Sequence, residues 1–315
     1  MMKNSLFISL TTLLMGCLLV SCEKAVIDDI DGSESKTTNV TIRVSDIEAD
    51  WADTETRALT NVSEVCSRLN YAVYQNGTRV KYKNQTNEDD DFGVFSLELE
   101  SGSYDVLVLA HSCKGNPTMT TPSKVQFTNP ESSSGTGFSD TFYYYGKMEV
   151  SGDKTQVDIS MKRATSMFCL VTTDVKPDNV KKFQFYYEGG SGALDATTGY
   201  GCVNSKQSVF VSLDDSQTGQ PLQFEMFTFL HSESGKVTFT VKAFNANEDV
   251  IYTKEFKDVP MQRNCITRYT GKFFVSDNPD DNPDDKPGED PDPDIPESVM
   301  VMVDPEWSAV YDYTF

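Results

Sequence analysis

Histidine, tryptophan and basic residues are scarce in this chain of 315 residues. It contains 2 His and 2 Trp, and its 27 Lys and Arg stand against 48 Asp and Glu, so the formal net charge is -21 at pH 7. Nucleic acids and anionic lipid surfaces attract proteins through clustered Lys and Arg, because binding releases counterions. The acidic composition therefore excludes nucleic acid from the predicted partners.

Residue patterns that carry catalysis are missing as well. The two histidines, His111 and His231, stand in no HExxH motif, and the chain has no Walker-A loop and no GxSxG elbow. Carboxylates are abundant, but abundance does not identify the pair that a glycosidase needs. The sequence predicts neither an enzyme nor a cofactor.

Cysteine lacks the spacing of a disulfide framework or a metal site. After the N-terminal segment the chain keeps an odd number of cysteines with no close pair: Cys66, Cys113, Cys169, Cys202 and Cys265. Disulfide scaffolds use an even number, and zinc sites place two cysteines a few residues apart. We therefore predict no disulfide framework and no metal ligation, and we expect Cys169 to be a small core residue.

Only one long apolar run occurs, and it lies near the N-terminus. Residues 6–20 follow Lys3 and are too few for a stable membrane span, which describes a secretory signal. The run ends in Leu19-Val20-Ser21-Cys22, which resembles the bacterial lipobox. We predict a signal peptide at 1–21 and acylation of Cys22, whose acyl chains (palmitate among them) would hold the chain in a membrane.

This segment has two alternative interpretations. Leu14-Met15-Gly16-Cys17 also resembles a lipobox, but cleavage there would leave the apolar residues 18–20 attached. In a plain secreted protein, Cys22 would be incidental. We prefer lipidation at Cys22 because charged residues follow it at once.

The sequence after Cys22 predicts an all-β fold. Short runs of alternating apolar and polar residues recur between Gly, Asn and Ser turns, and no long amphipathic helix is found. Asn76-Gly77 supplies two residues that tolerate positive φ, as a tight hairpin turn requires. We predict two tandem β-sandwich domains, at 38–162 and 163–275, after a polar tether at 22–37.

A different composition begins at residue 276. Residues 276–297 are rich in Asp and Pro and cannot bury a core, so we predict a stretched, solvated linker. Calcium binding is an alternative use of these carboxylates, but the Gly and the final Glu of an EF-hand loop are missing.

The C-terminal segment, 298–315, is apolar and aromatic again. Side chains alternate along a strand, which would put five residues on one face: Trp307, Ala309, Tyr311, Tyr313 and Phe315. Such a strand is an aggregation hazard in water and must pair with another strand. Two outcomes are open: it folds back onto its own sheet, or it is donated to another subunit.

Four segments share a pattern with one known family. They are 67–74, 102–111, 161–164 and 258–274, the last containing Val259-Pro260 followed by Arg263-Asn264. In this order, behind a lipobox, they resemble the fimbrillin superfamily of Bacteroidetes-type fimbrial lipoproteins. The similarity spans residues 38–275, and each motif alone is short.

The resemblance implies a surface lipoprotein of the outer membrane, built of transthyretin-like Greek-key sandwiches, that works in fimbriae and adhesion. In stalk members an arginine-specific protease cuts after the first strand, and a strand of a neighbouring subunit fills the groove. Here Arg57 is the candidate processing site, with an ordinary loop arginine as the alternative, and 307–315 is the candidate donor. Implied partners are other fimbrial subunits, the outer membrane through the acyl chains, and a host or bacterial surface receptor.

The role within a fimbrium stays open. The early strands resemble those of anchor subunits, which keep their lipid, whereas the Arg57 loop and the strand behind a linker suit a polymerising stalk subunit. An anchor subunit would end near Phe274, so residues 276–315 depart from that pattern. Stalk, anchor and tip roles all remain.

A glycan-binding surface lipoprotein is the alternative from another class. Such proteins also place β-sandwiches on an acylated tether, and they bind sugars on exposed aromatic side chains. The candidates are Trp51, Tyr143, Tyr144, Tyr145, Tyr186 and Tyr187. Because neighbouring strand positions alternate, at least one of the three consecutive tyrosines must face a core.

Overall fold

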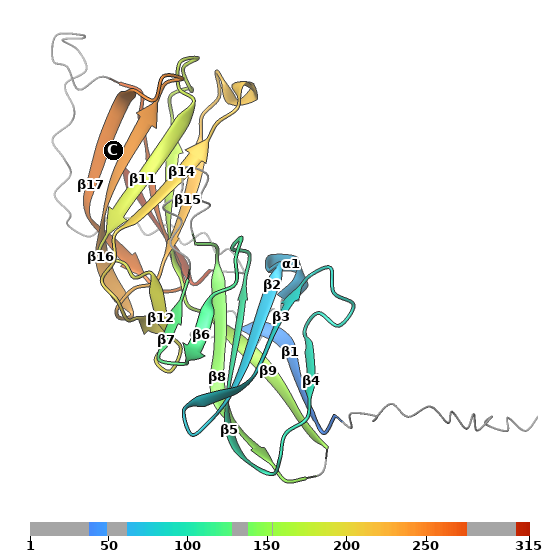
Figure 1. Cartoon of the computed structure of the whole chain (residues 1–315). Coiled ribbons are helices and arrows are strands. Elements are labelled where there is room, and N and C mark those ends of the chain that lie inside the picture. The colour runs from blue at the N-terminus through green and yellow to red at the C-terminus, as the bar shows by residue number, and fades with distance from the viewer. Residues whose placement is uncertain (1–37, 49–61, 128–137, 153, 276–306) are drawn as a thin grey trace, which may run out of the picture. The chain divides into compact units, whose positions relative to one another are not determined.

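The computed structural model describes residues 38–48, 62–127, 138–152, 154–275 and 307–315 (Figure 1). All of these residues belong to one compact unit, Thr37–Phe315, and the other unit, Met1–Lys36, lies outside them. The helices in the described part are α1 (Val62–Val65) and the 3-10 helix η1 (Asp215–Gln217). Strands make up nearly all the remaining regular structure, so the predicted all-β class is confirmed.

One sheet of seven strands occupies the first half of the described chain, up to residue 163. Its spatial order is β3 (Thr78–Thr86), β2 (Arg68–Gln75), β5 (Gly102–His111), β8 (Thr141–Val150), β9 (Thr155–Arg163), β1 (Val40–Glu48) and β4 (Val94–Leu97). Neighbouring strands are antiparallel except β9 and β1, which run parallel. Asn76 and Gly77, with φ of 50° and 77°, connect β2 to β3, so the predicted hairpin is confirmed.

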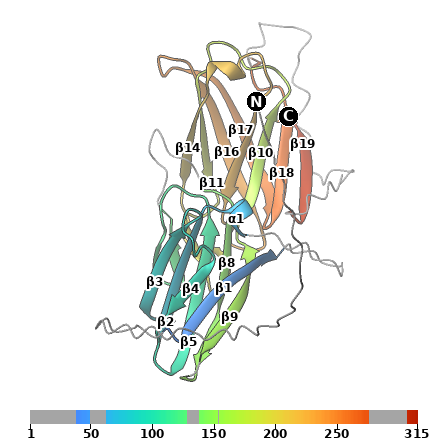
Figure 2. The same cartoon turned by 90° about the vertical axis from the view of Figure 1, so that its right-hand side faces the viewer.

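Two sheets of four strands make up the second half. The first has the order β15 (Gln223–Thr228), β10 (Ser166–Thr172), β18 (Cys265–Gly271) and β19 (Ala309–Thr314). The second has the order β14 (Gln207–Ser212), β11 (Lys182–Glu188), β16 (Ser234–Phe244) and β17 (Val250–Gln262). Strand β18 runs parallel to β10 on one side and to β19 on the other (Figure 2).

The two halves repeat one strand order. The run β3-β2-β5-β8 corresponds to β14-β11-β16-β17, and β4-β1-β9 corresponds to β15-β10-β18, with the same parallel and antiparallel pairings. In each half the first strand is therefore parallel to the last. Strand β19 is an addition to this pattern, outside β18. The division into two domains near residue 162 stays a prediction.

A small sheet joins strands from the two halves. Its order is β13 (Tyr200–Gly201), β12 (Ala193–Asp195), β7 (Lys124–Gln126) and β6 (Thr118–Thr121). Strands β7 and β12 pair through Gln126 with Ala193 and Val125 with Leu194. A buried cluster extends across this sheet and includes Leu107, Leu109, Phe127, Phe138, Leu194 and Phe229.

Each half also has a core of its own. In the first half, Val40 and Ile42 of β1 are fully buried against strands of the seven-stranded sheet. In the second half the two four-stranded sheets share a core, in which the Phe168 ring stacks on Phe239 with centroids 4.0 Å apart. Burial of this apolar surface is the main stabilising contribution to the fold.

A buried histidine ends strand β5. The His111 side chain has no exposed surface, and its Nε2 lies 2.7 Å from Asn70 Oδ1. Desolvation by burial, with a smaller contribution from the charge of Arg68, lowers the pKa of His111 from 6.5 to about 4. The imidazole is therefore neutral in the folded state at neutral pH.

We expect His111 to make the fold sensitive to acid. Between pH 6.5 and 4 the unfolded state binds more protons, so the contribution of His111 is complete above pH 6.5 and is lost as pH falls towards 4. The free energy of unfolding should fall by roughly 3 kcal/mol from this group. Urea denaturation at pH 7 and pH 4 should show a larger loss in the wild type than in His111→Gln, because the carboxylates titrate in both. Equal losses would contradict the assignment.

Candidate functional site: the seat of the C-terminal strand

Strand β19 lies on the outer edge of β18, and we call the surface that holds residues 307–315 the seat. The register runs from Cys265 opposite Ala309 to Thr270 opposite Thr314. Beyond the strand, the N–H of Phe315 donates to the Thr270 carbonyl at 3.2 Å. Main-chain pairing of this kind is independent of sequence, so the side chains must supply any selectivity.

The side chains facing the second-half core are aromatic. The Tyr313 ring stacks on Tyr269 with centroids 4.9 Å apart, and Phe315 meets Phe256 edge-on at 5.0 Å. The Tyr311 hydroxyl donates to Gln262 Oε1 at 3.2 Å. Each aromatic pair of this geometry contributes about 0.5–1.5 kcal/mol beyond its buried area.

The opposite side of β19 covers a second apolar cluster. Val310 and Trp307 are buried there with three residues of the neighbouring strands: Met167, Cys169 and Ile266. The Trp307 ring also stacks on Phe227 with centroids 6.3 Å apart. The segment is thus anchored on both faces of its sheet.

The Trp307 ring also covers a buried charge. The side chain of Arg163 is only 3% exposed, and its guanidinium carbon lies 3.8 Å from the Trp307 ring centroid and 4.7 Å from that of Phe142. Its Nε donates to both carboxylate oxygens of Asp140, at 2.9 and 3.0 Å. A guanidinium removed from water needs such a carboxylate and favours aromatic faces.

Asn264 links this charge to the C-terminal segment. It lies in the turn between β17 and β18 with a φ of 58°, and its Oδ1 accepts from Arg163 Nη1 at 2.6 Å. Its Nδ2 donates to Ser308 Oγ at 2.6 Å, and its carbonyl accepts from the Ser308 N–H at 2.8 Å. One asparagine therefore connects the end of β9 to the start of the docked segment.

Two further features shape the edge of β18. Arg268 Nη1 lies 3.3 Å from Asp312 Oδ1, which pairs opposite charges across the two strands. A Cβ added to Gly271 would lie 2.0 Å from the Phe315 carbonyl oxygen, so only glycine allows the chain end this close.

The predicted site residues fall into three groups. Cys22 and Arg57 lie outside the described residues. Tyr313 and Phe315 lie on the side of the strand that faces the second-half core, and the strand pairs with β18 of its own chain in this structure. Trp307 differs, because it packs with Val310 on the other side. The alternation does not reach it, since β19 begins at Ala309.

Sequence reasoning noted Arg163 and Asn264 as parts of short motifs but assigned them no role. One signal could have identified Arg163. The inward-facing residues of β9 include Ile159 and Met161, and the same alternation puts an arginine at the next inward position. A charge in such a position needs a buried partner. Asp140 supplies that partner, and the other contacts come from Asn264 and Trp307, about 100 and 145 positions later in the chain.

Both histidines have an oxygen atom as a partner. His231 Nδ1 lies 3.0 Å from the Gly201 carbonyl oxygen, and His111 is held by Asn70. Over the part of the chain that the structure describes, no group of three His, Cys, Asp or Glu could hold a metal ion, and no cysteine there forms a disulfide. No helix in the same residues has the length and apolar character to cross a membrane.

The aromatic residues considered for glycan binding are largely packing residues. Tyr143 and Tyr145 pack against the cluster that joins the two halves, and Tyr144 packs against the first-half core. Tyr187 is buried, and its hydroxyl donates to the Phe227 carbonyl at 3.1 Å. Tyr186 is half-buried, and Trp51 lies outside the described residues.

A family model matches residues 32–307, a span that includes both halves and reaches the tryptophan of the seat. Its description is "Family of unknown function (DUF6562)". The chain belongs to this family. No curated protein matches the sequence.

Several solved structures are similar to this DUF6562 member. One is described as a "putative adhesin" from Bacteroides ovatus, with 13% identity, a TM-score of 0.45, and coverage of 78% of this chain and 88% of that chain. The fimbrial anchor protein Mfa2 from Porphyromonas gingivalis has 11% identity, a TM-score of 0.41, and coverage of 68% and 80%. A fimbrial assembly protein from Parabacteroides distasonis has 14% identity, a TM-score of 0.36, and coverage of 74% and 89%.

Replacing Gly271 by alanine should loosen the C-terminal strand. The new Cβ would clash with the Phe315 carbonyl, and the aromatic contacts of Tyr313 and Phe315 would be lost. We expect the free energy of unfolding to fall by about 1–3 kcal/mol. Gly235→Ala is the matched control, because its Cβ would meet only Leu230 at an ordinary 3.7 Å. Urea denaturation measures both, and equal stabilities would show that the close approach is unimportant.

Proposed function

We propose that this chain is a cell-surface lipoprotein of the fimbrillin type, a fimbrial subunit that assembles by strand exchange and supports adhesion. Its fold would be two tandem transthyretin-like Greek-key sandwiches, at 38–162 and 163–275, followed by an acidic linker and a donor strand. Cys22 would carry the acyl anchor in the outer membrane. Other fimbrial subunits would be its partners.

The observation that carries this proposal is the way β19 is held. Among the described residues it is the last strand of its sheet and pairs on one side only, and it follows 31 residues of which many are Asp and Pro. Release of β19 would break its hydrogen-bonded pairing with β18 and the side-chain contacts of the segment, whereas most of the second-half core would stay in place. An edge strand with these properties is suited to exchange between subunits.

Strand β1 is a second element that exchange would use. It lies between β9 and β4, and Val40 and Ile42 fill the first-half core. Cleavage at Arg57 would separate β1 covalently from the rest of the chain. The subunit would then offer two edges for a donor: the place of β1, or the outer edge of β18.

Removal of residues 298–315 should abolish assembly on the cell surface. The donor strand would be absent, so the ladder of heat-resistant polymers seen by denaturing electrophoresis of surface extracts should disappear. Trp307→Ala should weaken the ladder, because it removes the ring that covers Arg163. Thr314→Ala, at an exposed position of the same strand, should leave it unchanged. An unchanged ladder after deletion would refute the donor assignment.

Replacing Cys22 by alanine should release the protein from the membrane. The acyl chains are the predicted anchor, and two or more of them are needed for stable attachment. Metabolic labelling with a fatty acid and membrane fractionation should show loss of label and of attachment in Cys22→Ala, and neither loss in Cys17→Ala. The reverse pattern would move the lipobox to Cys17.

The N-terminus of the mature protein decides its role. A chain that starts at Ala58 and runs as a polymer would be a processed stalk subunit. A monomer that starts at acylated Cys22 would be an anchor or a glycan-binding lipoprotein, and Arg57 would be a loop residue. Mass spectrometry of protein from the native surface distinguishes them.

A further inference from the structure

The C-terminal segment is matched on both of its faces to one edge of this fold. We infer that its acceptor in assembly is the outer edge of β18 in a second copy of this chain, which is the seat described above. This inference rests on the proposed function in one respect, that residues 307–315 act as the donor. It adds the identity of the partner and the place of exchange, and it needs no cleavage at Arg57.

The side chains of the segment that face the second-half core, Tyr311, Tyr313 and Phe315, do not fit the place of β1. Val40 and Ile42 are fully buried there, opposite Leu97 and Phe95 of β4. Tyrosine and phenylalanine would overfill space shaped for these smaller aliphatic side chains, and a tyrosine hydroxyl would need a partner in that core. At the seat the rings lie at the rim of the core, and the Tyr311 hydroxyl reaches Gln262.

The side chains on the opposite side of the segment do not fit the place of β1 either. Trp307 and Val310 need an apolar surface beside the strand, and the seat supplies one in Met167, Cys169 and Ile266. The corresponding face of β9 carries the exposed polar side chains Gln156 and Asp158, and β1 exposes Arg43. A donor strand in that position would leave its tryptophan on a polar surface.

Polar contacts of the seat add a more specific match. Trp307 covers the guanidinium of Arg163, and Asp312 lies opposite Arg268. Gly271 accommodates the carbonyl of Phe315. Every one of these partners belongs to the same chain as the strand, so a second copy offers the complete set. Another subunit would have to repeat all of them.

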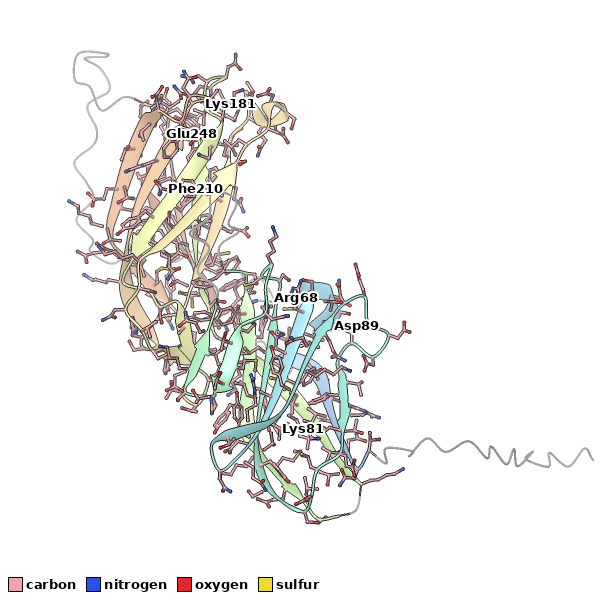
Figure 3. All side chains as sticks on the ribbon, in the orientation of Figure 1. Arg68, Lys81, Asp89, Lys181, Phe210 and Glu248 are labelled. Atoms are coloured by element: carbon pink, nitrogen blue, oxygen red, sulfur yellow. The ribbon has the colours of Figure 1, made fainter. Side chains whose placement is uncertain are left out.

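One other edge of the fold, strand β3, is less suited to accept a strand. One edge of the seven-stranded sheet is β3, which carries Arg79, Lys81 and Lys83 along its length, and Lys81, labelled in Figure 3, is exposed. Lysine on an edge strand opposes the addition of another strand. The edge of β18 is instead covered by β19, which a copy of β19 can replace contact for contact.

The segment that joins β18 to residues 307–315 is long enough for the exchange. Residues 276–306 number 31, and a chain of that length spans up to about 100 Å when extended. Two copies can therefore trade segments reciprocally, as in a domain-swapped dimer, or in succession along a fibre. The same tether also favours return to the chain's own seat, with an effective concentration on the order of millimolar, so exchange should require crowded copies.

A charge exchange between two intact chains tests the inference. One copy carries Arg268→Asp and the other Asp312→Arg. Each variant alone therefore has like charges at the contact between β18 and β19, whether the strand docks on its own chain or on an identical copy. In the mixture, a reciprocal pair places opposite charges at both contacts. We expect mixed dimers to exceed either homodimer by about fivefold for each contact. Native mass spectrometry of the two chains, mixed at about 1 mM, measures the ratio.

A control variant locates the contact. Gly271→Ala in both copies should abolish the mixed dimers, because the added Cβ closes the seat to Phe315. Circular dichroism of each variant checks that it folds, and exchange of a labelled peptide of residues 304–315 into the unmodified chain gives a second reading. The same peptide with Trp307→Ala should bind at least about tenfold more weakly, and this substitution leaves the sequence of the protein itself unchanged.

The outcomes separate this inference from the proposed function. Mixed dimers that vanish with Gly271→Ala support exchange at the seat. Absence of mixed dimers, or mixed dimers that persist with Gly271→Ala, would overturn it. Surface polymers that need both the tail and cleavage at Arg57 would also overturn it while leaving the strand-exchange function intact. Polymers that survive deletion of the tail would instead refute the donor role itself.

Discussion

The buried guanidinium of Arg163 is the interaction that the arrangement of this chain depends on. A charge with 3% of its side chain exposed is tolerated only with a full set of partners, and these come from distant parts of the sequence. Asp140 supplies the carboxylate, Asn264 an amide oxygen, and Trp307 the covering ring. The end of the first half, the last turn of the second half and the C-terminal segment therefore meet at one side chain.

The edge strands of the sheets are a second constraint on this fold. Both halves use one strand order, in which the first strand is parallel to the last, and the second half adds β19 outside its last strand. Edge strands expose unpaired main-chain groups. On β3 the edge carries basic residues, and on β18 the C-terminal segment covers the edge and becomes the edge strand itself. A segment that covers β18 in one copy has the contacts to cover it in another.

The sequence predicted the local structure better than the contacts. Asn76 and Gly77 specify their hairpin because few residues tolerate positive φ, and this preference acts without help from the rest of the chain. The aromatic alternation of Tyr313 and Phe315 likewise predicted a common face. It failed for Trp307, which precedes the strand, because side-chain direction follows alternation only within an extended ladder. The Arg163 network was out of reach, because it joins residues far apart in sequence.

By itself, the sequence determined the all-β class, the hairpin at Asn76-Gly77 and the need of the last strand for a partner. These follow from residue preference and from the two-residue period of a strand, which are local properties. The tertiary structure decided that this partner is β18, that the pairing is parallel, and that Trp307 covers Arg163. Those choices depend on the shape and charge of surfaces that exist only after distant segments have packed together.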